Sequence, residues 1–262
     1  MKRFYYLFVV AFVAMATNAS AQFVQSANDQ APLNTTNNNA SNFFKQMPSD
    51  DYGRLYVGYN PTKIKWEDYQ SQWEEELPFK HGITVGYLHA SNIVNNIPLY
   101  IEYGANFMYS FGKDEYSEDD SYGEYTQITK ANMYSVNVPV NLALRLSFNN
   151  DKVALTPYLG LNFRFNVAGN IKYEFEYYSD YYGSEEDSEK TNLFDSSDDD
   201  EAMGDYAFKR FQAGFNCGVN LNFKSFSLGV GYVADFSKIA NYEDGDYVGK
   251  LGVTTLSLGI KF

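Results

Sequence analysis

Hydrophobic and polar residues alternate along most of the chain from Gly53 to Phe262. In the closing segment 255–262, every second residue is Leu, Ile or Phe, and the residues between them are Thr, Ser, Gly and Lys. Successive side chains of a β-strand point to opposite faces, so this period of two predicts strands with one apolar and one polar face. The segments with this pattern are 54–60, 82–87, 99–110, 134–147, 153–167, 211–223, 226–236 and 254–262.

The polar face of these predicted strands is built mainly from Asn, Gly and Ser, which suits a small polar interior. Several segments also reach the roughly 9–11 residues that a tilted strand needs to cross a bilayer. A soluble β-sandwich alternates in the same way and is the competing interpretation. The two features favour an all-β fold, an eight-stranded antiparallel up-and-down transmembrane β-barrel. The mean hydropathy of −0.41 is compatible with this fold, because half of each strand faces a polar interior.

The connections between the predicted strands alternate between long and short. The long ones are 61–79, 111–130, 169–206 and 238–250, and the short ones are 90–97, 148–152 and 224–225. A membrane barrel typically carries long loops at one end and tight turns at the other. We therefore expect long, acidic extracellular loops at one end, and short periplasmic turns with both termini at the other.

The N-terminus predicts a secretory signal peptide, and export together with the predicted barrel implies the bacterial outer membrane. Lys2 and Arg3 precede an apolar run, and Ala19 and Ala21 supply a small-residue cleavage site. An N-terminal membrane anchor is the alternative, but the apolar run is shorter than the roughly 20 residues that a spanning helix needs. The predicted organisation is a signal peptide (1–21), a disordered periplasmic leader (22–52) and an outer-membrane β-barrel domain (53–262).

The charge and cysteine content exclude several classes of function. A formal net charge of −13 argues against nucleic acid as a partner, since phosphate binding needs clustered Lys and Arg. It also argues against adhesion to anionic lipid through a basic patch. Cys217 is the only cysteine, so no intramolecular disulfide forms. The sequence contains no nucleotide-binding loop and no Cys/His metal-binding cluster, and no cofactor is expected.

Outward-facing aromatic residues gather at the ends of the predicted strands, as in the interfacial girdles of membrane barrels. Phe262, the last residue, belongs to the girdle at the turn end. The residues at the turn end are Phe148, Phe223, Phe226 and Phe262, and those near the loop end are Tyr109, Tyr134, Phe165, Phe211 and Phe236.

Charged residues also occur at positions that face the interior. Eight strands enclose a space that side chains roughly fill, so an open aqueous pore is not expected. Unpaired buried charges are costly, and we expect these residues to pair and to fix the barrel wall. A conducting or gated path is the alternative interpretation. The predicted interior network consists of Arg54, Glu102, Arg145, Arg164, Asp235 and Lys261.

Two features could carry chemistry. His89 and Ser91 share the outward face, and a His can act as general base for a neighbouring Ser, as in barrel enzymes that deacylate lipid A. The predicted topology places them at the periplasmic turn, away from the outer leaflet where such enzymes work, and we expect no enzymatic activity. The acidic segments Asp114–Asp120 and Asp195–Glu201 lack the spacing and Gly of an EF-hand Ca²⁺ loop, and solvated surface loops are expected there. Weak Ca²⁺ or Mg²⁺ bridging to lipopolysaccharide phosphates is the alternative.

The central strands resemble a known family. "YSVNVPVNLALRLSF" (Tyr134 to Phe148), followed by "LTPYLGLNFRFNVAG", is similar to the bacterial outer-membrane β-barrel domain family that includes PorT-like proteins of Bacteroidetes-type bacteria. The Val-Pro-Val step at 138–140 and the Pro-Tyr-Leu-Gly at 157–160 carry most of the match, and the architecture resembles small OmpX- and OmpA-type barrels. The resemblance covers about 53–262 and is specific for the fold rather than the task.

This resemblance implies partners as well as a fold. The alternating C-terminal residues Leu258, Ile260 and Phe262 resemble the signal read by the barrel-assembly machinery. Outer-membrane lipid and lipopolysaccharide are the expected surroundings. A structural or surface-recognition role is expected, and an accessory role in an envelope or secretion complex, with an envelope protein partner, is the alternative that PorT-like proteins imply.

Overall fold

The structure, a computed structural model, describes residues 51–68, 74–76, 79–94, 97–120, 123–148, 152–179, 183–194, 208–241 and 247–262. The predicted signal peptide and the leader up to residue 50 lie outside these ranges. No helix within them is long and apolar enough to cross a membrane. The strands within them are β1 (Tyr52–Tyr59), β2 (Thr62–Asp68), β3 (Glu74–Glu76), β4 (His81–Asn92), β5 (Leu99–Asp120), β6 (Gly123–Leu144), β7 (Leu146–Phe148), β8 (Val153–Ser179), β9 (Gly183–Asn192), β10 (Phe211–Phe223), β11 (Phe226–Asp235), β12 (Ala240–Asn241) and β13 (Tyr247–Lys261).

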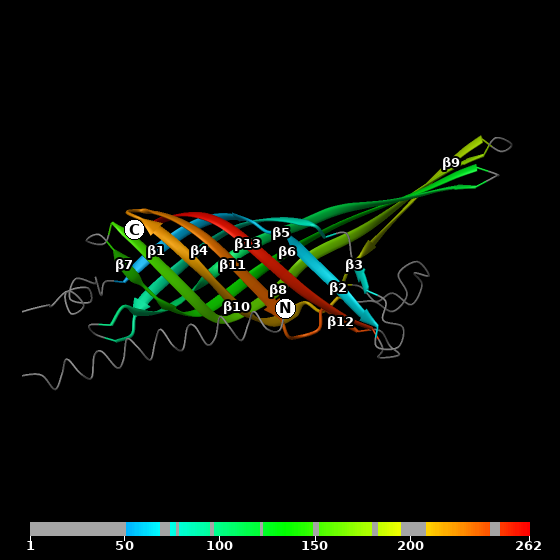
Figure 1. Ribbon diagram of the computed structural model, residues 1–262. Helices are drawn as coiled ribbons and strands as arrows, with labels where there is room; N and C mark the ends of the chain where they lie inside the picture. Colours follow the sequence, from blue (N-terminus) through cyan, green and yellow to red (C-terminus); the bar gives the residue numbers. More distant parts are fainter. Residues whose placement is uncertain are drawn as a thin grey trace, which may run out of the picture.

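Eight of these strands close into a ring, which confirms the predicted barrel (Figure 1). The order around the ring is β1-β4-β5-β6-β8-β10-β11-β13, and β13 pairs back with β1. All neighbours are antiparallel, and each strand of the ring pairs with the next one along the chain. Closure leaves no open sheet edge in the ring, as a bilayer requires.

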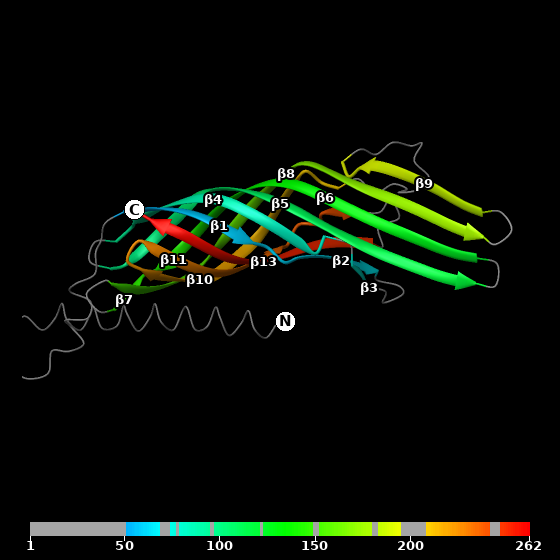
Figure 2. The same ribbon diagram turned by 90° about the horizontal axis from the view of Figure 1, so that it is seen from above.

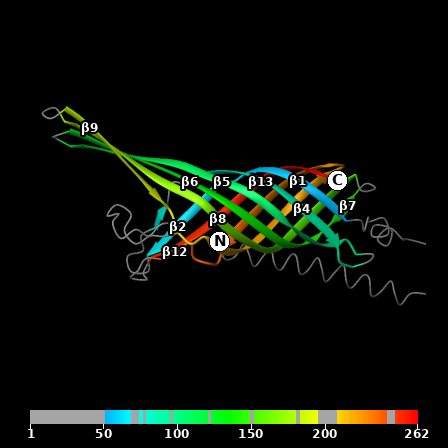
Figure 3. The same cartoon turned by 180° about the vertical axis from the view of Figure 1, so that it is seen from behind.

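The start of β1 and the last residue of the chain meet at one end of the barrel. Gly53 donates its backbone N–H to the Phe262 carbonyl at 2.8 Å, and Phe262 donates back at 3.0 Å. The turn of Lys224 and Ser225 between β10 and β11 lies at the same end, and Lys224 takes a φ of 53° there, as tight hairpin turns require. Figure 3 shows the C-terminus beside β7 at this turn end, and β9 at the opposite end.

Two hairpins continue beyond the barrel at the loop end (Figure 2). β5 and β6 stay paired as far as Asp120 and Gly123, and β8 and β9 as far as Ser179 and Gly183. Since β6 also pairs with β8 along this length, the four strands form one sheet. We call it the projecting sheet, and it comprises residues 111–120, 123–132, 170–179 and 183–192.

The prediction that the long connections are loops is therefore partly wrong. Segment 111–130 is almost entirely strand, and 61–79 and 238–250 contain β2, β3, β12 and the start of β13. Outside a membrane, both faces of a strand can be polar, so the period-two signal that reveals a spanning strand disappears. Pairing of backbone groups maintains these strands instead.

The two faces of the barrel strands have the predicted environments. Outward residues such as Leu55, Val85 and Leu258 are more than half exposed, and inward residues such as Arg54 and Thr84 are buried. Leu144 is an exception, because it has the outward parity but is only 5% exposed. It ends β6, directly before the break in the strand at Arg145.

Candidate functional site

The outer surface of the barrel is an apolar belt. Exposed hydrophobic residues occur on every strand of the ring, and aromatic residues stand at both of its ends. At the turn end, Phe262 is 68% exposed and stacks on Tyr87 at a centroid distance of 6.3 Å. At the loop end, Tyr109 stacks on Tyr134 at 4.7 Å. An uninterrupted apolar surface of this extent is costly in water and favourable in lipid.

The interior at the turn end holds a cluster of charges around Tyr52. Tyr52 donates its hydroxyl to Glu102 Oε1 at 2.8 Å, and Arg54 Nη2 lies 4.0 Å from Glu102 Oε2. The Arg145 guanidinium and the Lys261 ammonium lie 5.6 Å and 4.8 Å from the centre of the Tyr52 ring. Four of the six residues predicted for the interior network thus meet here. The organising Tyr52 was assigned to the leader at the sequence level, although it is the first residue of β1.

The other two predicted network residues, on β8 and β11, pair with each other. Arg164 Nη1 lies 2.7 Å from Asp235 Oδ2, and both side chains are almost completely buried. Arg164 also donates from Nε to Asn137 Oδ1 at 3.0 Å. A buried guanidinium and carboxylate are tolerated when they pair and hydrogen-bond in this way.

Between these two groups of charges, the interior is lined by asparagines. Asn162 donates to Asn137 at 3.2 Å, and Asn216 donates to Asn141 at 2.9 Å. An internal cavity of about 70 Å³ remains among these side chains. A space of this size holds a few water molecules, since one water occupies roughly 10–15 Å³ by the same measure.

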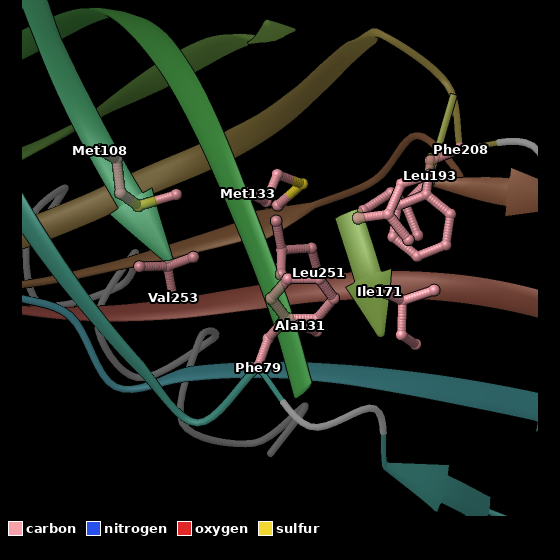
Figure 4. Close-up of a cluster of buried hydrophobic side chains, with 10 residues drawn as sticks. Phe79, Met108, Ala131, Met133, Ile171, Leu193, Phe208, Leu251 and Val253 are labelled. Atoms are coloured by element: carbon pink, nitrogen blue, oxygen red, sulfur yellow. The ribbon is translucent and has the colours of Figure 1, made fainter. Parts of the chain in front are cut away.

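The loop end of the interior is apolar, which the sequence analysis missed. Inward residues of β5, β6, β8 and β13 pack there against residues from the connecting segments, and all are at most 4% exposed (Figure 4). We call this group the loop-end cluster. Met108 and Met133 interrupt the Asn- and Gly-rich pattern of the inward positions. This was the signal in the sequence for an apolar layer, where a polar interior was expected throughout. The cluster consists of Phe79, Met108, Ala131, Met133, Ile171, Leu193, Phe208, Ile239, Leu251 and Val253.

The projecting sheet has one aromatic face, which continues the inward face of the barrel strands. Its middle strands place Tyr125 and Phe175 in stacked contact at 6.4 Å, and Phe175 stacks on Tyr173 at 6.3 Å. Tyr177 is 37% exposed beside them, and Tyr116 on β5 is 56% exposed. The outer strands contribute acidic residues to the same face, which are Asp114, Glu118, Glu185, Asp187 and Glu189.

His89 and Ser91 do not form a nucleophile–base pair. Ser91 donates its hydroxyl to Asp51 Oδ2 at 3.2 Å, and His89 Nε2 lies 3.9 Å from the same oxygen. Asp51 also accepts the backbone N–H of Asn92 at 2.9 Å. Asp51 therefore accepts the hydrogen bond that a catalytic serine would donate to its histidine. This arrangement holds the start of β1 against the end of β4.

The acidic segments show no metal centre in the part of the chain that the structure describes. Asp114–Asp120 lies on β5, where alternate carboxylates point to opposite faces of the projecting sheet. Asp195–Glu201 lies outside the described residues. Cation bridging by these segments remains a prediction that the structure does not test.

A closed ring of antiparallel strands with an apolar exterior and a largely polar interior defines a transmembrane β-barrel of the outer-membrane type. No family model and no curated protein sequence matches the chain, so the PorT-like resemblance stays a prediction. One similar solved structure is Ail, the attachment invasion locus protein of Yersinia pestis, in complex with the heparin analogue sucrose octasulfate. Its sequence is 16% identical, and the match covers 81% of this chain and 99% of that chain with a TM-score of 0.33.

Two further solved structures are similar at the same low level. Neisserial surface protein A (NspA) is 13% identical, with 79% of this chain and 97% of that chain covered and a TM-score of 0.36. The translocator domain of the autotransporter NalP from Neisseria meningitidis is 10% identical, covers 96% of this chain and 98% of that chain, and has a TM-score of 0.22. At such scores the likeness carries no argument about function.

Proposed function

We propose that the protein is a non-enzymatic outer-membrane barrel that recognises a partner at the cell surface through the aromatic face of the projecting sheet. In this proposal the sheet is extracellular and both termini are periplasmic. The observation that carries it is that four paired strands extend well beyond the apolar belt. The barrel would be closed without this extension, so the sheet serves a purpose other than spanning the membrane.

The chemistry of the aromatic face favours a basic polypeptide as the partner. Tyr125, Phe175 and Tyr177 lie along the centre, and carboxylates line both sides on β5 and β9. Carboxylates attract Lys and Arg, and aromatic rings bind the same cations through their π faces. Aromatic rings on β5, β6 and β8 and carboxylates on β5 and β9 thus share one face, and both kinds of group favour cationic side chains.

Neighbouring tyrosines on β8 provide a matched test. Tyr177 lies on the aromatic face, whereas Tyr178 lies on the opposite face and is 55% exposed. Binding of a fluorescent oligo-arginine peptide to the purified protein in amphipol is measured by anisotropy. Tyr177→Ala is expected to weaken binding severalfold, and Tyr178→Ala to leave it unchanged. Equal binding by both variants and the unmodified protein would overturn the proposal, and co-purification of membrane partners instead would favour the accessory role.

We also propose that Leu258, Ile260 and Phe262 serve as the barrel-assembly signal. Phe226 provides the control, because it lies at the same end of the barrel and is 60% exposed, close to the 68% of Phe262. Phe262→Ala is expected to lower the folded fraction in outer membranes several times more than Phe226→Ala, read from heat-modifiable mobility on gels. Equal losses would show that the two residues contribute only as lipid anchors.

A further inference from the structure

We propose that the outward face of the projecting sheet binds the phosphate groups of outer-leaflet lipid through four lysines, Lys113, Lys130, Lys172 and Lys190. We call them the lysine row. This site is separate from the aromatic face and goes beyond partner recognition, but it rests on the proposed placement of the barrel in the outer membrane.

Strand register alone creates the row. Lys113 pairs with Lys130, Lys130 with Lys172, and Lys172 with Lys190, so each of the four strands contributes one lysine. Directly paired residues of antiparallel strands lie on the same face, with Cβ atoms about 4.5–5.5 Å apart. The projecting sheet contains no other Lys or Arg, and its remaining charged residues are Asp or Glu.

Carboxylates neutralise only part of the row. Glu174 accepts hydrogen bonds from Lys130 at 2.5 Å and from Lys172 at 2.9 Å, and Glu115 accepts one from Lys113 at 2.7 Å. The hydrogen bonds from Lys130 and then Lys172 lower the pKa of Glu174. Like charges placed directly opposite one another destabilise a sheet. Of the carboxylates near the row, Glu115 hydrogen-bonds one lysine and Glu174 is shared by two, while Glu176 acts on Lys113 only through its charge, which leaves room for a further anion.

The row lies at the height of lipid headgroups. Tyr109 and Tyr134 form a pair in the loop-end girdle, and Lys113 and Lys130 follow four residues farther on the same face. Four residues are about 13 Å along a strand and about 10 Å in height at a tilt of 35–45°. Acyl chains end below this level and headgroups begin, and flexible lysines reach toward them.

Three of the four residues between the girdle and the lysine row are asparagines. The intervening register row contains Phe111 on β5 and then Asn132, Asn170 and Asn192, whose amides face the same side as the lysines. The outward face therefore changes from aromatic to amide to ammonium with increasing distance from the bilayer. This gradient matches acyl chain, headgroup sugar and phosphate.

Charges farther out on the sheet favour lipid over a soluble anion. The rows farther out on the outward face contain first Glu115 and Glu174, then Glu176 and Glu186, and then Asp119 and Glu124. An anionic polymer approaching from solvent would lie across these carboxylates and be repelled. A lipid phosphate reaches the lysines from the membrane side without passing them. Lys113, Lys130 and Lys172 are accessible, with 49%, 47% and 42% of their side chains exposed.

The test compares two double variants that lose the same charge. Lys130→Gln with Lys172→Gln removes the centre of the row, and Lys152→Gln with Lys224→Gln removes two exposed lysines at the turn end. Each protein in amphipol is titrated with lipid A that carries both phosphates or with dephosphorylated lipid A. At roughly fivefold per lysine, the row variant should bind phosphorylated lipid A about 25-fold more weakly, whereas the control should match the unmodified protein.

Further controls and competing ligands distinguish the possible outcomes. Heat-modifiable mobility verifies that every variant is folded, and Tyr177→Ala should keep its lipid affinity, so this proposal and peptide recognition can fail independently. Equal affinity for the two lipids, or equal loss in the control, would overturn the proposal. Lysine-dependent binding of heparin without preference for phosphorylated lipid would assign the row to a glycan instead. Displacement of lipid by an equal concentration of inorganic phosphate would show a simple anion site.

Discussion

Single residues in the interior are held by partners from distant strands. Arg164 on β8 meets Asp235 at the end of β11, and Arg54 on β1 meets Glu102 on β5. In a narrow interior, a charge without such a partner would be costly to bury. Asn137 accepts hydrogen bonds from both Arg164 and Asn162, and Asn216 donates to Asn141 on a neighbouring part of the wall.

Asp235→Asn is expected to lower the free energy of unfolding by about 3–5 kcal/mol, because Arg164 would keep an uncompensated charge in the interior. The combined variant Arg164→Met with Asp235→Leu should recover most of this loss, since no charge remains buried. Urea unfolding in detergent, followed by far-UV circular dichroism, measures both. A combined variant as unstable as the single one would show that the pair is not coupled.

At the scale of elements, the connections distinguish the two ends of the barrel. At the turn end, the two-residue turn of Lys224 and Ser225 joins β10 to β11, and Gly53 and Phe262 exchange hydrogen bonds. The loop end contributes Leu193, Phe208 and Ile239 to the loop-end cluster, so these three residues from the connections pack into the mouth of the barrel. The projecting sheet stands beside this cluster and shares Ala131 and Ile171 with it.

Met133→Ala should destabilise the barrel by about 2–5 kcal/mol, because it leaves a cavity in a completely buried group. Leu228→Ala is the control, since Leu228 is 58% exposed on the lipid face and its truncation leaves no cavity. Amide hydrogen exchange should also accelerate at the loop end in Met133→Ala. Equal losses in the two variants would contradict a structural role for the cluster.

Considered as a whole, the molecule is a tube closed at three levels. Charges around Tyr52 fill the turn end, asparagines and the Arg164–Asp235 pair fill the middle, and the loop-end cluster fills the mouth. The cavity of about 70 Å³ lies between these levels. Eight-stranded barrels are narrow enough for side chains to do this.

The closed interior predicts that the purified protein shows no large, steady conductance in planar bilayers. The control is a general porin reconstituted in the same bilayers at the same protein-to-lipid ratio. Each layer of side chains would have to move aside for ions to pass, so brief, rare openings are compatible with this structure. A steady open current would show that the layers do not seal the tube.

The sequence predicted which charged residues face the barrel interior, but not which of them pair with one another. Arg54, Glu102, Arg164 and Asp235 were identified as interior residues from their parity, which needs only the pattern along one strand. Their partners depend on which strands are neighbours and in what register, and one sequence does not contain that information. The lysine row was missed for the same reason, and the net charge of −13 pointed away from any basic patch.

The sequence by itself determined the barrel, because a spanning strand must expose apolar residues to lipid and polar residues to the interior at every second position. Only the tertiary structure decided the loop-end cluster, the projecting sheet and the lysine row. Outside the membrane, that two-sided constraint no longer acts on each strand separately. Pairing between segments such as Lys113–Lys130 and Lys172–Lys190 then determines which side chains share a face.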